Sequence, residues 1–262
     1  MLKLRNSQKG LAPILIVLAV LVVGGVGFFV YSQAKDDGGN VVQTEASKAV
    51  NDACNTALKD KDFCKFASNW QTVLNYTSVN TSTSNGTTST IKVETEDANK
   101  TRITSTDNGK EIAAYITIGK DFYTKDETDG AWTKYTDTSA NSNTSTDVKS
   151  DFKVSDFDAA TLAKTEYKKI GKEDCGKLSC FKYQIVDKEN TANEQFIWFD
   201  TKDYLMRRMT ISESGTSSDI TVSYEHVSIS APTPVKESSS STITPTQAQI
   251  DAALQAAQDS NQ

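Results

Sequence analysis

The sequence predicts an α+β protein, with one transmembrane helix followed by a single antiparallel β-meander of about ten strands and two helices. Three observations predict this fold. Residues 11–31 form an unbroken apolar stretch, apolar residues recur every three or four positions from residue 44, and this period changes to two from about residue 76. Short turns between the later segments indicate antiparallel neighbours in one sheet.

The apolar stretch is long enough to span a membrane. A helix rises about 1.5 Å per residue, so residues 11–31 form about 30 Å of helix, which matches a bilayer core. Lys3, Arg5 and Lys9 all precede the stretch. Positive charge on that side predicts a cytoplasmic N-terminus and an extracytoplasmic main domain.

Two alternatives to a retained anchor are a cleaved signal peptide and a lipoprotein. A cleaved signal peptide has an apolar region of about 7–15 residues, shorter than this one, although Ser32-Gln33-Ala34 offers a cleavage site. Retention is favoured, and cleavage after Ala34 stays open. A lipoprotein needs a cysteine directly after the apolar stretch, and the first cysteine here is Cys54.

The chain divides into five segments by composition. Residues 1–10 are the cytoplasmic N-terminus, 11–31 the transmembrane signal anchor, 32–43 a polar linker and 44–232 the extracytoplasmic domain. Residues 233–262 form a Ser/Thr/Pro linker, followed by a weak helix or a disordered tail.

The four cysteines come as two close pairs, Cys54 with Cys64 and Cys175 with Cys180. Outside the membrane an even number of cysteines indicates disulfides. The alternative is a zinc site, but structural zinc sites usually space paired cysteines by two to four residues, and nine residues separate the first pair. Two local disulfides are therefore predicted.

The domain begins with a helix whose N-cap is Thr44, and Phe63, Phe66 and Trp70 continue its apolar face. Residues 156–164 predict a short inserted helix, and residues 136–150 a polar loop. Asn108-Gly109 is a hairpin signal, and residues 219–229 predict the last strand. Residues 194–200 are apolar at consecutive positions, which predicts a strand covered on both faces.

Composition excludes several function classes. The formal net charge is −6; Lys3, Arg5 and Lys9 contribute +3, so the remainder carries −9, which does not suit nucleic acid. The chain has one histidine and no GxSxG, P-loop or GxGxxG motif. We therefore predict no enzyme activity, no metal site and no cofactor.

The late strands carry a family resemblance. Residues 196–209 read FIWFDTKDYLMRRM, and residues 227–232 read VSISAP. This resembles the lipoprotein carrier superfamily that includes LolA, LolB and the LppX/LprG-like proteins, in which an aspartate-containing turn of the form D-x-x-x-x-L-x-R links two strands. The resemblance spans roughly residues 44–232. It implies a half-open barrel, a curved sheet whose concave face holds acyl chains and is capped by helices. The missing lipobox cysteine and the retained anchor depart from the carriers in that group.

Candidate site residues follow from strand alternation. Those assigned to the lining of an apolar cavity are Ile112, Ala114, Ile116, Ile118, Phe181, Tyr183, Phe196, Trp198, Val222 and Tyr224. The same pattern fits a filled core, which is the default because an empty cavity loses packing energy. His226 and Arg207 are candidates for the cavity rim. Alternatively, His226 is a solvent-exposed strand end and Arg207 pairs with a nearby carboxylate.

Three functions are compatible with this sequence. The leading prediction is a membrane-anchored extracytoplasmic protein that binds a lipid or another apolar small molecule without catalysis. The second is a structural or protein-interaction module of the cell surface with a filled core. The third is a sensory domain that acts through a separate partner, because the cytoplasmic segment is too short for an output domain. The sequence identifies no protein partner and no oligomeric state.

Overall fold

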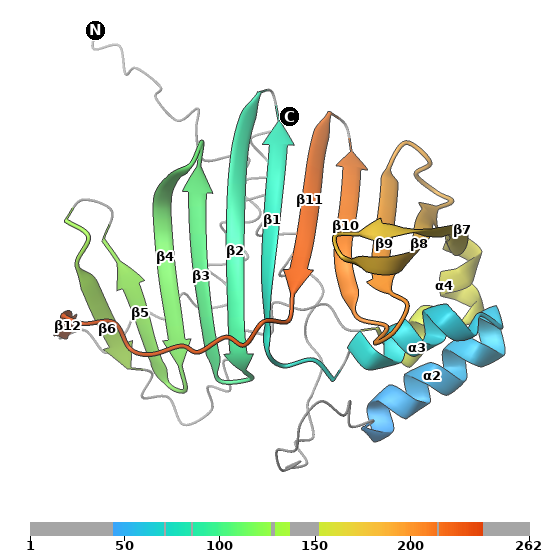
Figure 1. Ribbon diagram of the computed structural model, residues 1–262, viewed down its shortest axis with the longest axis horizontal. Coiled ribbons are helices and arrows are strands. Elements are labelled where there is room, and N and C mark those ends of the chain that lie inside the picture. The colour runs from blue at the N-terminus through green and yellow to red at the C-terminus, as the bar shows by residue number, and fades with distance from the viewer. Residues whose placement is uncertain are drawn as a thin grey trace, which may run out of the picture.

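The computed structural model describes residues 44–237, apart from 71, 85, 127–128, 137–151 and 214. Its centre is one sheet of twelve strands in the order β12-β6-β5-β4-β3-β2-β1-β11-β10-β9-β8-β7 (Figure 1). The sheet is curved and unclosed, with β12 and β7 as its two edges. The prediction of one curved antiparallel sheet is confirmed. The described residues contain twelve strands in place of about ten, and among these only β12 pairs in parallel, with β6.

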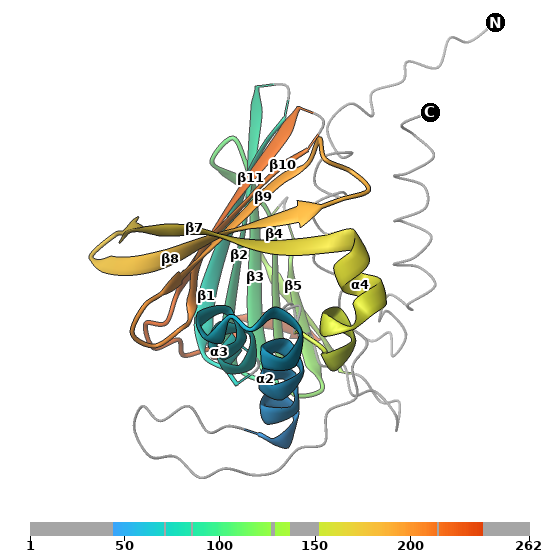
Figure 2. The ribbon, with the colours of Figure 1, turned by 90° about the vertical axis from the view of Figure 1, so that its right-hand side faces the viewer.

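Tight turns join most neighbouring strands. The strand bounds are β1 Tyr76–Ser84, β2 Thr87–Asp97, β3 Lys100–Asp107, β4 Lys110–Ile118, β5 Asp121–Lys125, β6 Trp132–Thr136, β7 Thr165–Cys175, β8 Leu178–Asp187, β9 Glu194–Asp200, β10 Met206–Glu213, β11 Thr216–Ser223 and β12 Val235–Glu237. Asn108 and Gly109, both with positive φ, form the predicted turn between β3 and β4. The sheet twists so strongly that β7 and β8 run almost across the direction of β1 to β5 (Figure 2).

The helices gather at the β7–β10 end of the sheet (Figure 1). They are α2 (Glu45–Leu58), α3 (Lys61–Trp70), the 3₁₀ turn η1 (Val154–Phe157) and α4 (Ala159–Lys164). The predicted N-cap is confirmed, because Thr44 Oγ1 accepts a hydrogen bond from the Ser47 N–H at 3.1 Å. Lys59 in the left-handed conformation ends α2, so the single predicted N-terminal helix is two helices.

Strand pairing defines two faces of the sheet, because directly opposed residues share a face. On the helix-side face, Tyr183, Phe199 and Val222 pack with α2, α3 and η1 in the main apolar core. On the opposite, strap-side face, Ile116 and Tyr123 pack beneath the chain that follows β11. We call residues 224–234, which connect β11 to β12, the strap.

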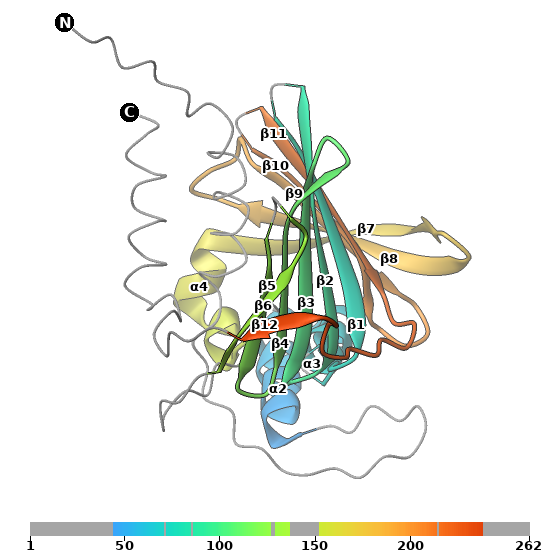
Figure 3. The ribbon, with the colours of Figure 1, turned by 90° about the vertical axis from the view of Figure 1, so that its left-hand side faces the viewer.

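The strap replaces the last part of a predicted strand. Residues 219–229 were expected to form one strand, but β11 ends at Ser223. The chain then crosses the lower ends of the strands to reach β12 (Figures 1 and 3). Asn75 explains the change, since its side chain accepts from the Val227 N–H at 2.9 Å and donates to the Val227 carbonyl at 3.0 Å. Val227 and Ile229 alternate as in a strand, yet their backbone bonds a side chain instead of a neighbouring strand.

Acid is expected to loosen the strap. The Lys100 ammonium, 2.7 Å from Glu96, and the Ile229 N–H hold the pKa of Glu96 below its ordinary 4.5. A lowered pKa in the folded state stabilises the fold above about pH 4.5, and this contribution is lost as the pH falls through the folded pKa. We expect Glu96→Gln to flatten the decline of the melting temperature between pH 7 and 3, with Glu111→Gln on β4 as control. An unchanged acid profile would contradict this role of Glu96.

Both predicted disulfides are confirmed, with no free cysteine among the described residues. Cys54–Cys64 joins α2 to α3 and is fully buried, whereas Cys175–Cys180 closes the β7–β8 hairpin. The two loops close over 10 and 5 residues, so the chain-entropy argument gives each bridge about 2–3 kcal/mol.

The paired variant Cys54→Ala/Cys64→Ala should lower the free energy of unfolding in urea by about that 2–3 kcal/mol. Cys175→Ala/Cys180→Ala should cost no more, because its loop is shorter. A loss well under 1 kcal/mol for the first pair would contradict the argument.

Among the described residues, no helix is long and apolar enough to cross a membrane. The anchor predicted over residues 11–31 and the linker over 32–43 lie outside the described ranges, as do almost all of the loop predicted over 136–150 and residues 238–262. The inserted helix predicted over 156–164 is present as η1 followed by α4, with Asp158 as the N-cap of α4.

Candidate ligand-binding face

The predicted cavity residues do not line one surface. Phe181, Tyr183, Val222 and Tyr224 pack in or against the helix-side core. Five others lie on the strap-side face, as strand register shows: Ala114, Ile116, Ile118, Phe196 and Trp198. Ile112 occupies a β-bulge opposite Ser105 and Thr106. The strand register therefore distributes these residues over both faces of the sheet.

The helix-side part of the predicted lining is a filled core. Phe199 stacks on Phe66 with centroids 4.5 Å apart and also lies 5.3 Å from Tyr183. The Tyr183 hydroxyl donates to Asp60 at 2.8 Å, so its polar end is satisfied beside the start of α3. Burial and the adjacent Asp60 carboxylate raise the pKa of Tyr183. This region fits the default expectation of a packed core.

The aromatic pair on the strap-side face, Phe196 and Trp198, is covered by different side chains from those of the helix-side core. Lys182 lies opposite Trp198 in the register, and the two ring systems of Phe196 and Trp198 are 6.1 Å apart. The Lys182 ammonium and the Arg208 guanidinium lie 4.8 and 5.1 Å from the Trp198 ring, and the indole N–H donates to Glu173. Strand β9 is thus covered on both faces, as predicted, but on this face by the stems of charged side chains.

Neither rim candidate lines an apolar cavity. Arg207 sits at a β-bulge and pairs with the buried Asp200 at 2.9 Å, with its guanidinium 4.6 Å from the Tyr224 ring. His226 is exposed on the strap, beyond the end of β11. The alternatives stated from the sequence, a solvent-exposed histidine and a paired arginine, describe both residues.

A surface that the sequence assignment missed lies on strands β1 to β4. We call the helix-side positions of these strands the β1–β4 face. Its residues are Ser78, Asn80, Ser82, Ser89, Ile91, Val93, Thr95, Thr101, Ile103, Ser105, Ala113, Tyr115 and Thr117. Ile91, Val93 and Ile103 form an apolar cluster separate from the main core. All the buried apolar residues of the described helices belong to the main core, so none of those helices packs on this cluster.

The β1–β4 face also holds polar groups without partners. Thr95 is 8% exposed, and its hydroxyl is buried with no hydrogen-bond partner. The Asp107 Oδ1 atom, at the far end of the same face beside Ser89, is likewise buried and unpaired. Buried polar atoms normally have a partner, so unpaired ones at both ends of one face call for an explanation. A bound molecule that supplies the missing hydrogen bonds is one such explanation.

The positions of the charged side chains on β2 and β3 support the division of the sheet into a helix-side and a strap-side face. Lys92, Glu94 and Arg102 alternate with the β1–β4 face and lie on the strap side, where Arg102 pairs with Glu94 at 2.7 Å. The Arg102 guanidinium holds the pKa of Glu94 below its usual value. Alternation of Ile91 and Val93 with these charges was the signal in the sequence that could have identified the face.

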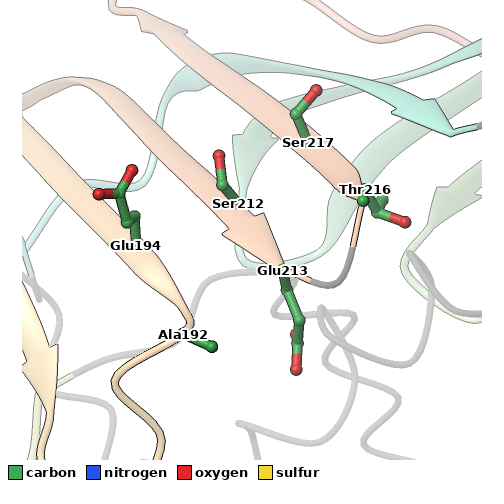
Figure 4. Close-up of a pocket in the computed structure, with 7 residues that line it drawn as sticks. Ala192, Glu194, Ser212, Glu213, Thr216 and Ser217 are labelled. Carbon is green, nitrogen blue, oxygen red and sulfur yellow. The ribbon is translucent and has the colours of Figure 1, made fainter.

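A polar hollow of about 370 Å³ lies elsewhere, at the ends of the β8–β9 and β10–β11 connections (Figure 4). Its lining residues are Ala192, Glu194, Ser212, Glu213, Gly215, Thr216 and Ser217. It contains none of the residues predicted to line an apolar cavity. In the part of the chain that the structure describes, no group of three or more His, Cys, Asp or Glu side chains could hold a metal ion.

Comparison with solved structures finds similar folds. LppX from Mycobacterium tuberculosis has a TM-score of 0.39 at 11% identity, over 70% of this chain and 98% of that chain. LprF from Mycobacterium bovis has a TM-score of 0.37 at 13% identity, over 72% and 97%. A LolA superfamily protein from Nitrosomonas europaea has a TM-score of 0.24 at 9% identity, over 68% and 91%.

LppX and the LolA superfamily are also named in the group that residues 196–209 resemble. No protein-family model and no curated protein matches the chain. The function proposed below therefore rests on the geometry of this chain.

Proposed function

We propose that this protein is a non-catalytic binding protein of the cell envelope, anchored through residues 11–31, that holds a lipid or another apolar ligand on its β1–β4 face. The observation that supports this most is the separate cluster of Ile91, Val93 and Ile103. Apolar side chains in the middle of a sheet are stabilised by burial against another apolar surface. The described helices place their apolar faces on the β7–β11 half instead.

Neighbouring side chains favour a long, narrow ligand. Ile91 pairs across the strands with Asn80 and Ser105, and Val93 pairs with Ser78 and Ile103. Serine and asparagine on either side are smaller than the aromatic side chains that fill the core on the β7–β11 half. Tyr115 and Phe122 stack at 5.9 Å and border the face on β4 and β5. An apolar chain lying along β2 would contact the aliphatic cluster, and the Tyr115–Phe122 stack would lie to one side of it.

A binding titration tests the proposal. With an apolar fluorescent probe such as N-phenylnaphthylamine, the variant Ile91→Thr/Val93→Thr should bind about tenfold more weakly, because each substitution removes at least one buried methyl group. Threonine keeps the β-branched shape, so the strand should persist. Val79→Thr on the strap side of β1 is the matched control and should bind as the unmodified protein does. Equal binding by all three would overturn the proposed site.

The alternative function is a structural or protein-interaction module. The packed rings around Phe199 and Tyr183 favour it for the β7–β11 half, since that half leaves its predicted cavity residues buried in a core. The two functions differ in ligand binding. A surface module would show no saturable uptake of apolar probes at any position of the sheet.

A further inference from the structure

The chemistry of the β1–β4 face also specifies the polar end of its ligand. We propose that the ligand is an amphiphile whose head group is uncharged and hydroxylated, such as a glycerol or a sugar, and that this head group lies on the polar end of the face. The inference rests on the proposed function and adds the class of head group.

The face has two zones along the strands. Its middle is the aliphatic cluster of Ile91, Val93 and Ile103. Toward the β1–β2 and β3–β4 turns, it carries hydroxyl and amide groups in register with one another, which we call the serine row: Asn80, Ser82, Ser89, Ser105 and Ser218. Asn80, Ser82, Ser89 and Ser105 are buried. A ligand that spans both zones must be apolar at one end and polar at the other.

The serine row binds through neutral groups. Ser82 shares a hydrogen bond with Ser218 at 2.7 Å and lies 3.5 Å from the Asn80 side-chain oxygen. Hydroxyl and amide groups both donate and accept, so they match the mixed donors and acceptors of a polyol. Recognition of phosphate or carboxylate instead uses Arg, Lys or a helix N-terminus. The residues of the serine row include no such group.

Asp107 is a second reason to expect a head group that is not an anion. It lies beside Ser89 at the end of the row, and its Oδ1 atom is buried without a partner. A carboxylate accepts hydrogen bonds and donates none when ionised, so its unpaired oxygen suits an O–H donor and repels a phosphate. The Thr95 hydroxyl, unpaired on the other side of the aliphatic cluster, can bond a second polar group such as an ester. The two unpaired groups thus bracket the apolar zone.

Three amphiphiles with the same twelve-carbon chain test the head group: dodecyl maltoside, dodecyl phosphate and dodecylammonium, each titrated below its micelle concentration into residues 35–262. This segment contains the described cores and both disulfides. We expect dodecyl maltoside to bind at least tenfold more tightly than either charged amphiphile. Free maltose should bind far more weakly than the maltoside, which distinguishes an amphiphile site from a sugar site.

Variants test whether the serine row provides the preference for dodecyl maltoside. Ser89→Ala/Ser105→Ala should reduce the preference for dodecyl maltoside at least fivefold while leaving binding of the apolar probe N-phenylnaphthylamine unchanged. Thr90→Ala/Thr104→Ala, on the strap side of the same two strands, is the matched control and should keep the preference. Asp107→Asn should weaken discrimination against dodecyl phosphate.

Each other outcome overturns the inference in a distinct way. Equal binding of all three amphiphiles would leave the proposed apolar site standing and remove the head-group specificity. Tighter binding of dodecyl phosphate or dodecylammonium would assign a charged ligand. Binding of none of them would overturn both proposals and leave a segment of this chain, such as residues 238–262, as the occupant of the face.

Discussion

Phe199→Ala is expected to lower the free energy of unfolding by about 3–5 kcal/mol, the usual cost of removing a buried aromatic ring. Phe199 is fully buried and contacts the rings of Phe66, Phe181 and Tyr183. Its loss leaves a cavity at the junction of α3 with β8 and β9. Unfolding in urea, followed by circular dichroism, measures the change.

Phe196→Ala is the matched control, on the same strand and three residues away. Phe196 is only partly buried on the strap side, where it contacts Trp198 and Lys182, so we expect a loss of about 1 kcal/mol. Equal losses would contradict the difference in burial between the two rings and the register of β8 with β9.

Asp200→Ala is expected to destabilise the protein by about 3–5 kcal/mol, because it removes one partner of a buried ion pair. Asp200 is 1% exposed and accepts from Arg207 and from the backbone N–H of Lys202 at 3.1 Å. This carboxylate therefore holds the turn between β9 and β10 closed. Arg207→Ala should also destabilise, since it leaves the Asp200 charge buried without its cation.

The neighbouring ion pair of Arg208 and Asp219 is the control for Asp200 and Arg207. Arg208 and Asp219 form a two-bond pair at 2.9 and 2.7 Å, but both side chains are about half exposed, so Asp219→Ala should cost less than about 1 kcal/mol. A double-mutant cycle on each pair in urea should give a coupling energy several times larger for Asp200 with Arg207. Similar couplings would contradict the structural role of Asp200.

Local signals in the sequence predicted the elements well. Thr44 as an N-cap, the Asn108-Gly109 turn and the two cysteine pairs all act over a few residues, and all are present in the structure. The strap could not be predicted in the same way. Val227 and Ile229 alternate as in a strand, but their pairing depends on Asn75 and Glu96, more than 130 residues earlier in the chain.

The grouping of the ten candidate residues fails for a related reason. Alternation separates the two faces of each strand, but it does not reveal which face of one strand continues the face of another. Ile116 was grouped with Tyr183, and the strand register places them on opposite sides of the sheet. Bulges at Glu96 and Arg207 shift the register further. Alternation shows which positions of β2 share a side, and the pairing of the strands then joins the helix-side positions of β1 to β4 into one face.

The resemblance seen in residues 196–209 also gains a physical basis. Asp200 and Arg207 of the D-x-x-x-x-L-x-R turn form the buried ion pair that closes the β9–β10 connection. These residues therefore act on the fold, and the ligand proposal depends on a different part of the sheet. Variants of the turn should change stability, whereas variants of Ile91 and Val93 should change binding.

Native mass spectrometry of residues 35–262, secreted into an oxidising compartment and purified without detergent, tests the central claim most directly. The proposed function predicts a bound mass in the lipid range that is released on denaturation, and its loss from the Ile91→Thr/Val93→Thr variant. A clean unliganded mass that stays unchanged after incubation with a lipid extract would contradict it, and would favour a structural surface module.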